Sequence, residues 1–277
     1  MNIKIDVHQN GRYESKLDAV DEWKVPDIVK KEIFDFIRQA QIGQVQLGKK
    51  LSDRTLSKYL SLLRHSLEIL NKSTLKLTKK DIEDFDKQLT KQNLASSSDF
   101  RRNLKIFLKW KIGENKTREI AGWLDTRYKQ KTPDYLSEQE VSKLFKVCKS
   151  PAERFLIAVL FDGGCRAEEF LNIRLEDIQL PVQNENYVKL TLKKEYSKTN
   201  GRVISLYWKH SLEAINDFLK ERKQKGIKSD EPIYQNTYDG MRMFLARMGK
   251  RILHKEVFPH LFRHSSATFY ATKLNRQ

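Results

Sequence analysis

The chain has 277 residues, and 39% of them are hydrophobic, which is enough to build hydrophobic cores and excludes global disorder. Its formal net charge of +17, spread over almost every segment, predicts a polyanionic partner. We favour nucleic acid, because dispersed cations neutralise phosphates, over an anionic membrane surface or a generally basic background composition.

Cysteine usage and hydropathy exclude further classes of protein. The two cysteines, Cys148 and Cys165, lack the spacing of metal ligands, so we expect neither a zinc site nor a disulfide framework. No apolar stretch approaches the length of a membrane span, and the first residues lack the apolar segment of a signal peptide. We therefore expect a cytoplasmic protein without a membrane partner.

Helical patterns predict a first domain at residues 25–112, after a polar arm at residues 1–24. Leucines recur at alternating four- and three-residue steps from Leu56 to Leu70, which aligns them on one helix face. A later helix carries basic side chains opposite its apolar face. We assign these side chains to DNA binding: Arg101, Arg102 and Lys105.

Residues 113–135 are the expected connection to a second domain. Gly113 breaks the helical pattern, and the end of the segment is too basic to pack as a core. A basic linker is usually solvated, but between two nucleic-acid-binding domains we expect it to lie along phosphates. We therefore add Arg127, Lys129 and Lys131 to the DNA-binding residues.

The second domain is expected at residues 136–277. The alternating segments 187–193 and 202–206 predict two strands, and Asn200-Gly201 between them is typical of a hairpin turn. Helical patterns lie on both sides of this hairpin. The whole chain is therefore predicted to be mainly α-helical with a small antiparallel β-hairpin or sheet.

Two capping boxes predict where helices begin. Thr78 is followed three residues later by Asp81, and Ser137 is followed at the same spacing by Glu140. In such a pair, each side chain accepts a hydrogen bond from the other residue's backbone N–H.

A Gly-Gly-x-Arg-x-x-Glu motif at residues 163–169 is the first candidate for chemistry. The glycines end a helix and leave the backbone open to a ligand, and Arg166 then begins the next helix, where anions are favoured. Glu169 lies one turn later and can orient Arg166 from behind. Taken alone, the motif is explained equally well by a helix break with a surface Arg–Glu pair.

A His-x-x-Arg motif is the second candidate. Pro259 opens the last predicted helix, and the spacing puts His260 and Arg263 on one helix face. His264 is expected to point elsewhere, as a packing residue or an exposed cap. Two guanidiniums and an imidazole together suit phosphate binding and proton transfer without a metal ion.

The hairpin loop supplies a lysine between the two motifs. Lys198 lies near the loop tip, where it can deliver an ammonium group into a DNA groove, and Lys193 and Lys194 are alternatives. Arg202, at the end of this loop, is assigned to DNA binding. The His-x-x-Arg motif is weak alone, but in this order the motifs and the lysine are specific.

On these motifs, the second domain resembles the catalytic domain of the tyrosine recombinases, the phage-integrase family. The first domain is similar in length and helical content to the core-binding domain of that family. The resemblance implies an enzyme that cuts and rejoins double-stranded DNA sites through a covalent 3′-phosphotyrosine, as a tetramer and without a metal ion or other cofactor. These short catalytic motifs resemble those of archaeal virus and plasmid integrases more than those of bacterial chromosome-dimer resolvases.

The resemblance also implies a role for each candidate residue. Arg166 and Arg263 take the places of the two catalytic arginines, and Glu169 that of the acidic residue of the first motif. His260 takes the place of the motif histidine, and Lys198 that of the hairpin lysine, the general acid for the 5′-hydroxyl leaving group.

The family's tyrosine nucleophile lies about thirty residues beyond the His-x-x-Arg motif, whereas this sequence stops at Gln277, fourteen residues after Arg263. We therefore expect the nucleophile beyond Gln277 and a chain that binds DNA without cutting it. Tyr270 is a weaker candidate, because it lies about 10 Å along the helix axis from Arg263. The alternatives are a non-catalytic DNA-binding protein, a truncated integrase fragment or an RNA-binding helical protein.

Overall fold

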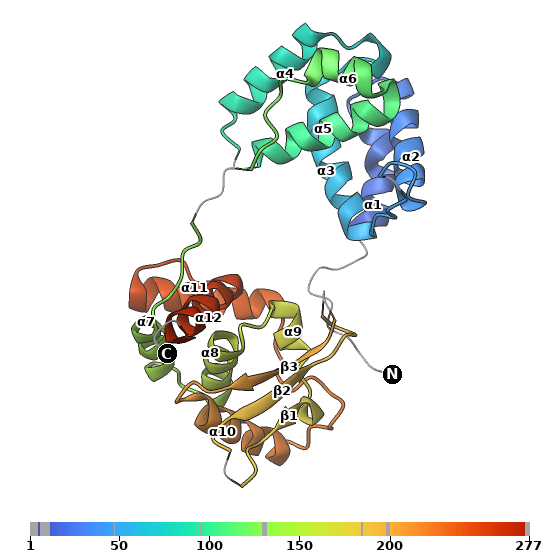
Figure 1. Cartoon of the computed structure of the whole chain (residues 1–277). Helices are drawn as coiled ribbons and strands as arrows, with labels where there is room; N and C mark the ends of the chain where they lie inside the picture. Colours follow the sequence, from blue (N-terminus) through green and yellow to red (C-terminus); the bar gives the residue numbers. More distant parts are fainter. Residues whose placement is uncertain are drawn as a thin grey trace. The chain divides into compact units, whose positions relative to one another are not determined.

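The computed structural model divides the chain into two compact units (Figure 1). The helical unit comprises His8–Gln130, and the α/β unit comprises Met1–Val7 together with Lys131–Gln277. No described helix is long and apolar enough to span a membrane. The residues that the structure describes are 5, 12–46, 48–94, 96–128, 132–183, 185–197 and 200–274.

The helical unit packs its helices around an apolar core. The leucine stripe that starts at Leu56 lies in α3 and is buried as far as Leu67, while Leu70 is only partly buried. The predicted capping box of Thr78 and Asp81 is present at the start of α4. The helices are α1 (Arg12–Asp18), α2 (Asp27–Gln41), α3 (Asp53–Leu70), α4 (Lys79–Lys91), α5 (Ser97–Ile112) and α6 (Glu114–Ala121), with 3-10 turns η1 (Ala19–Glu22) and η2 (Thr74–Lys76).

The helical unit extends beyond the predicted boundaries at both ends. α1 and η1 lie within the predicted arm at residues 1–24, yet Val20 and Trp23 are buried in the core. α6 lies within the predicted linker and buries Ile120 in the same core. The apolar residues of these short segments are too few to give a periodic pattern, so tertiary packing alone reveals them.

The α/β unit combines helices with a three-stranded antiparallel sheet of order β1-β2-β3. β2 and β3 are the predicted hairpin, with Leu190 opposite Ile204. β1 has two residues, too few for an alternating pattern. The elements are α7 (Glu138–Lys146), α8 (Pro151–Gly163), α9 (Ala167–Leu171), η3 (Leu175–Asp177), β1 (Ile178–Gln179), β2 (Val188–Leu192), β3 (Arg202–Leu206), α10 (Ser211–Gln224), α11 (Tyr238–Leu253) and α12 (Pro259–Leu274).

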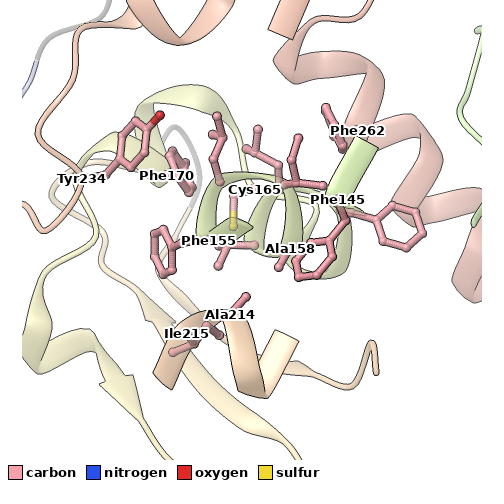
Figure 2. Packing of buried hydrophobic residues seen from close by; sticks show 14 of the residues in the cluster. Phe145, Phe155, Ala158, Cys165, Phe170, Ala214, Ile215, Tyr234 and Phe262 are labelled. Carbon is pink, nitrogen blue, oxygen red and sulfur yellow. The ribbon is translucent and has the colours of Figure 1, made fainter. Parts of the chain in front are cut away.

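The central element of the α/β unit is α8, which is buried on nearly every side from Phe155 to Asp162. It packs against α7, α10, α12 and β3. Figure 2 shows Phe155 and Ala158 of this helix in the apolar cluster that also contains Ile215 of α10 and Phe262 of α12. The motifs that follow α8 and open α12 are therefore attached to one rigid core.

Residue 5 belongs to the α/β unit rather than to a loose arm. The backbone N–H of Ile5 donates to Oδ1 of Asn172 at 2.8 Å, and Nδ2 of Asn172 donates to the Ile5 carbonyl at 2.9 Å. The Ile5 side chain packs against the core of this unit. The predicted arm at 1–24 is thus wrong for its described residues, which pack against one unit or the other.

Gly164 ends α8 in the left-handed region, with φ +53°. A Cβ there would lie 3.0 Å from Oγ of Ser266 in α12. Gly164→Ala is therefore expected to lower the free energy of unfolding by about 2–4 kcal/mol, combining backbone strain with overpacking. Gly226→Ala is the matched control, because Gly226 also has positive φ but no atom near its Cβ position, and we expect it to cost about 1 kcal/mol. Urea unfolding of both variants measures the difference, and equal losses would contradict the close approach of α12.

Candidate active site

The two sequence motifs meet at the end of α8. Arg166 is the N-cap residue of the short helix α9, in an extended conformation (φ −69°, ψ 154°). Its backbone N–H donates to Oε2 of Glu169 at 2.9 Å, and its Nη1 donates to Oε1 at 2.9 Å. Glu169 thus holds both the backbone and the guanidinium of Arg166, which leaves the rest of that guanidinium free to face a ligand.

Glu169 is a fully buried carboxylate surrounded by donors. Arg202 of β3 approaches it as a bidentate fork, with Nη1 and Nη2 each 3.0 Å from one carboxylate oxygen. The hydroxyl of Ser197 donates to Oε1 at 2.7 Å. Burial acts to raise the pKa of Glu169, but the Arg202, Arg166 and Ser197 hydrogen bonds outweigh it and lower the pKa to about 2. The carboxylate is therefore ionised throughout the physiological range.

Arg263 reaches the same place from α12. Its Nη1 donates to the Gly164 carbonyl at 2.7 Å, and no described carboxylate forms an ion pair with it. Burial, followed by repulsion from Arg166 and Arg202, lowers the pKa of Arg263. Among the described residues, Arg166 and Arg202 share the Glu169 carboxylate and Arg263 has no carboxylate partner, so the site carries excess positive charge suited to an anion such as phosphate.

His260 lies in the first turn of α12 and is exposed. Partial withdrawal of its ring from water, together with repulsion from His264, Arg263 and Arg166, lowers its pKa below 6.5. His264 does not point away from His260 as expected, but it is a packing residue: its ring lies perpendicular to that of His260 with centroids 4.7 Å apart. The i, i+4 spacing of the two histidines was the signal for this contact.

The hairpin loop also approaches the site. Lys198 lies outside the described residues, but Ser197 before it and Arg202 after it both hydrogen bond to Glu169. Arg202, predicted to bind DNA, is therefore placed in the site as the partner of this carboxylate. Of the alternative lysines, Lys193 is engaged by Glu176 and by Asp177, whose Oδ1 is 3.1 Å from the Lys193 Nζ.

The remaining predicted DNA-binding residues that the structure describes belong to the helical unit. Arg101 pairs with Asp86 at 2.5 Å. Arg102 donates to a backbone carbonyl at 2.8 Å, and the two residues Arg102 and Lys105 line a hollow of about 380 Å³ on the helical unit. Arg127 is 89% exposed. Lys129 and Lys131 lie outside the described residues.

Tyr270 is held by a buried carboxylate. Its hydroxyl donates to Oδ1 of Asp162, which is 3% exposed. Burial, reinforced by the nearby charge of Asp162, raises the pKa of Tyr270 well above 10. A phenol in this environment resists the ionisation that a nucleophile requires.

No group of three or more His, Cys, Asp or Glu side chains in the described part of the chain is arranged to hold a metal ion. The described site consists of guanidiniums, imidazoles and one carboxylate. It can bind a phosphate, stabilise added negative charge on it, and exchange a proton through an imidazole.

Comparisons with known proteins bear on this site. A family model described as the phage integrase family matches residues 134–274. The sequence is 23% identical over 224 residues to tyrosine recombinase XerA of Saccharolobus solfataricus, covering 77% of this chain and 72% of that protein. It is 28% identical over 183 residues to transposase A from transposon Tn554 of Staphylococcus aureus, covering 60% of this chain and 48% of that protein.

Solved structures show the same fold. A lambda integrase dimer bound to a COC′ core site superposes with a TM-score of 0.64 at 16% identity, covering 88% of this chain and 70% of that chain. XerH bound to a palindromic difH substrate in a post-cleavage complex gives a TM-score of 0.58 at 15% identity, covering 99% and 88%. A lambda integrase tetramer bound to a Holliday junction gives 0.64 at 16% identity, covering 89% and 74%.

Proposed function

The chain belongs to the phage integrase family and is by family a tyrosine recombinase, and we propose that it cuts and rejoins specific double-stranded DNA sites through a 3′-phosphotyrosine. The observation that carries this proposal is that Arg166 and Arg202 bind the buried carboxylate of Glu169, while Arg263 donates to the Gly164 carbonyl two residues before Arg166. The positive charge of the three guanidiniums exceeds that of the single carboxylate, which suits binding of a phosphate.

In the proposed reaction, a tyrosine oxygen attacks the phosphorus and the bond to the 5′-oxygen breaks. Arg166 and Arg263 bind the non-bridging oxygens, whose charge increases in the transition state. Lys198 gives a proton to the leaving 5′-oxygen, and His260 takes up the proton of the attacking tyrosine or holds the phosphate. Glu169 keeps Arg166 in place. The phosphodiester energy is conserved in the covalent link, so no other energy source is needed.

We further propose that residues 1–277 bind DNA without cutting it. The last tyrosine among them is Tyr270, whose hydroxyl is held by Asp162. The nucleophile of the proposed reaction would then be a tyrosine other than Tyr270. The alternative is a non-catalytic DNA-binding protein or an integrase fragment, which would bind phosphate at this site without catalysing cleavage.

For partners, we propose double-stranded attachment sites and assembly of four protomers on two of them. The support for DNA binding is the net charge of +17 together with basic residues on both units. We place the protein inside a host cell, acting for a mobile element of the archaeal virus or plasmid type.

The proposal predicts steeply salt-dependent DNA binding. A chain that contacts many phosphates should lose about 10³-fold in duplex affinity between 50 and 200 mM salt. Electrophoretic mobility shift on a random-sequence duplex measures this loss, and selection from a random pool then identifies the preferred site. Equal affinity for RNA, or salt-independent binding, would contradict it.

A nicked suicide duplex that contains the selected site tests the chemistry. Residues 1–277 are expected to form no covalent adduct, and Tyr270→Phe is the matched control. An adduct that disappears in Tyr270→Phe would identify Tyr270 as the nucleophile and overturn the proposal that residues 1–277 do not cut DNA. An adduct in a longer form with a later tyrosine, but not in residues 1–277, supports the proposed enzyme over the non-catalytic binder.

A further inference from the structure

α12 is attached to the end of α8 by three polar contacts along one face. Arg263 donates to the Gly164 carbonyl, Ser266 donates to the Asp162 carbonyl at 3.4 Å, and Tyr270 donates to the Asp162 carboxylate. The spacing of these residues, i, i+3 and i+7, places them on a single stripe of the helix. Asp162 immediately precedes the Gly-Gly-x-Arg-x-x-Glu motif, and Gly164 lies within it. The stripe therefore fixes the His-x-x-Arg turn relative to Arg166.

Asp162, which accepts the hydrogen bond of Tyr270, is itself held in place by other residues. It is 3% exposed, and its Oδ2 accepts hydrogen bonds from the Trp208 backbone N–H at 2.8 Å and from the Ser211 hydroxyl at 2.6 Å. Its other oxygen, Oδ1, accepts from Tyr270. The carboxylate is thus held by the start of α10 and in turn holds α12.

We propose that Tyr270 is a positioning residue for phosphate binding, acting through Asp162 to set the axial position and rotation of α12. The inference rests on the proposed function, because it concerns the phosphate that Arg263 binds. A hydrogen bond two turns from Arg263 restrains the helix against rotation and sliding. Phosphate binding by the Arg263 guanidinium depends on its position and is therefore sensitive to both movements. Apolar contacts such as that of Phe161 with Phe269 also hold α12 against α8, but they are non-directional.

The chain offers a matched pair of variants for the test. Tyr270→Phe and Ser211→Ala each remove one hydroxyl donor from the same buried carboxylate, but only the first removes a contact to α12. Inorganic phosphate is titrated into the 277-residue chain, and the Nε–H resonance of Arg263 is followed by NMR. Thermal unfolding of each variant reports the accompanying loss of stability.

Tyr270→Phe is expected to weaken phosphate affinity about threefold to tenfold, the range of one hydrogen bond, and to shift the Arg263 resonance in the free protein. Ser211→Ala is expected to leave affinity within about twofold and this resonance in place, despite a similar loss of Tm. Equal weakening by both variants, or by neither, would overturn the inference. If Tyr270→Phe does not fold, Ser266→Ala replaces it, and the inference stands only if that variant weakens affinity more than Ser211→Ala.

Arg166→Ala and Arg263→Ala separate this inference from the proposed function. If neither weakens phosphate binding, the phosphate site itself is wrong. If both weaken it while Tyr270→Phe does not, only the role of Tyr270 is wrong.

Discussion

Replacing Arg166 with alanine is expected to slow DNA cleavage about 10²–10³-fold in a form of the protein that carries the nucleophilic tyrosine. The guanidinium is fixed by Glu169 at 2.9 Å and is 30% exposed, so it is pre-oriented toward the charge that develops on the phosphate. DNA affinity should fall only slightly, because one contact among many phosphate contacts is lost. The measurement is the rate of covalent adduct formation on a nicked duplex, beside the dissociation constant for the same duplex.

Two controls sharpen this prediction. Arg166→Lys keeps the charge but loses the planar fork, and we expect it to remain strongly impaired. Lys225→Ala removes one positive charge from the end of α10, where Lys225 pairs with Glu221, and should leave cleavage unchanged. A loss of cleavage that merely follows a loss of DNA binding would show that Arg166 serves affinity rather than catalysis.

Glu169→Gln is expected to lower the free energy of unfolding by about 3–5 kcal/mol near neutral pH, because it removes the counter-charge of a buried ion pair. Glu169 is fully buried, and Arg202 and Arg166 both donate to it. The amide would direct N–H groups at guanidinium N–H groups and leave the three guanidiniums to repel one another. Urea unfolding measures the loss. Glu221→Gln, which disrupts only a surface pair with Lys225, should cost much less.

The effect of Glu169→Gln should depend on pH in a defined direction. The pKa of Glu169 falls from 4.5 to about 2 on folding, so its ionised form stabilises the fold fully above 4.5. That stabilisation is lost progressively as the pH falls toward 2, because the carboxylate then takes up a proton. The difference in free energy of unfolding between the original protein and the variant should therefore decrease as the pH falls from 4.5 toward 2. A difference in free energy of unfolding that stays constant down to about pH 2 would contradict the charge-based explanation.

Local patterns were sufficient to predict the strands and several helix starts. β2 and β3 fall within the alternating segments 187–193 and 202–206. Ser137 and Glu140 form the predicted capping box that opens α7. These signals depend on neighbouring residues, so they can be interpreted without the tertiary structure.

Features that depend on distant residues could not be predicted in this way. The sequence places Arg202 at the end of a hairpin loop, which suggested DNA contact, but its pairing with Glu169 joins residues 33 positions apart and depends on the tertiary fold. The burial of Trp23 depends likewise on helices of the same unit that follow it in the chain. The motif spacing predicted which residue types could converge, whereas the fold determines which of them face one carboxylate.

The pairing of Ile5 with Asn172 has a consequence for folding during synthesis. The two residues are 167 positions apart, and the whole of the helical unit lies between them. At about 5–20 residues per second, roughly 8–33 s pass on the ribosome between the appearance of Ile5 and that of its partner. The helical unit can be completed during that interval, before the partner of Ile5 has been translated.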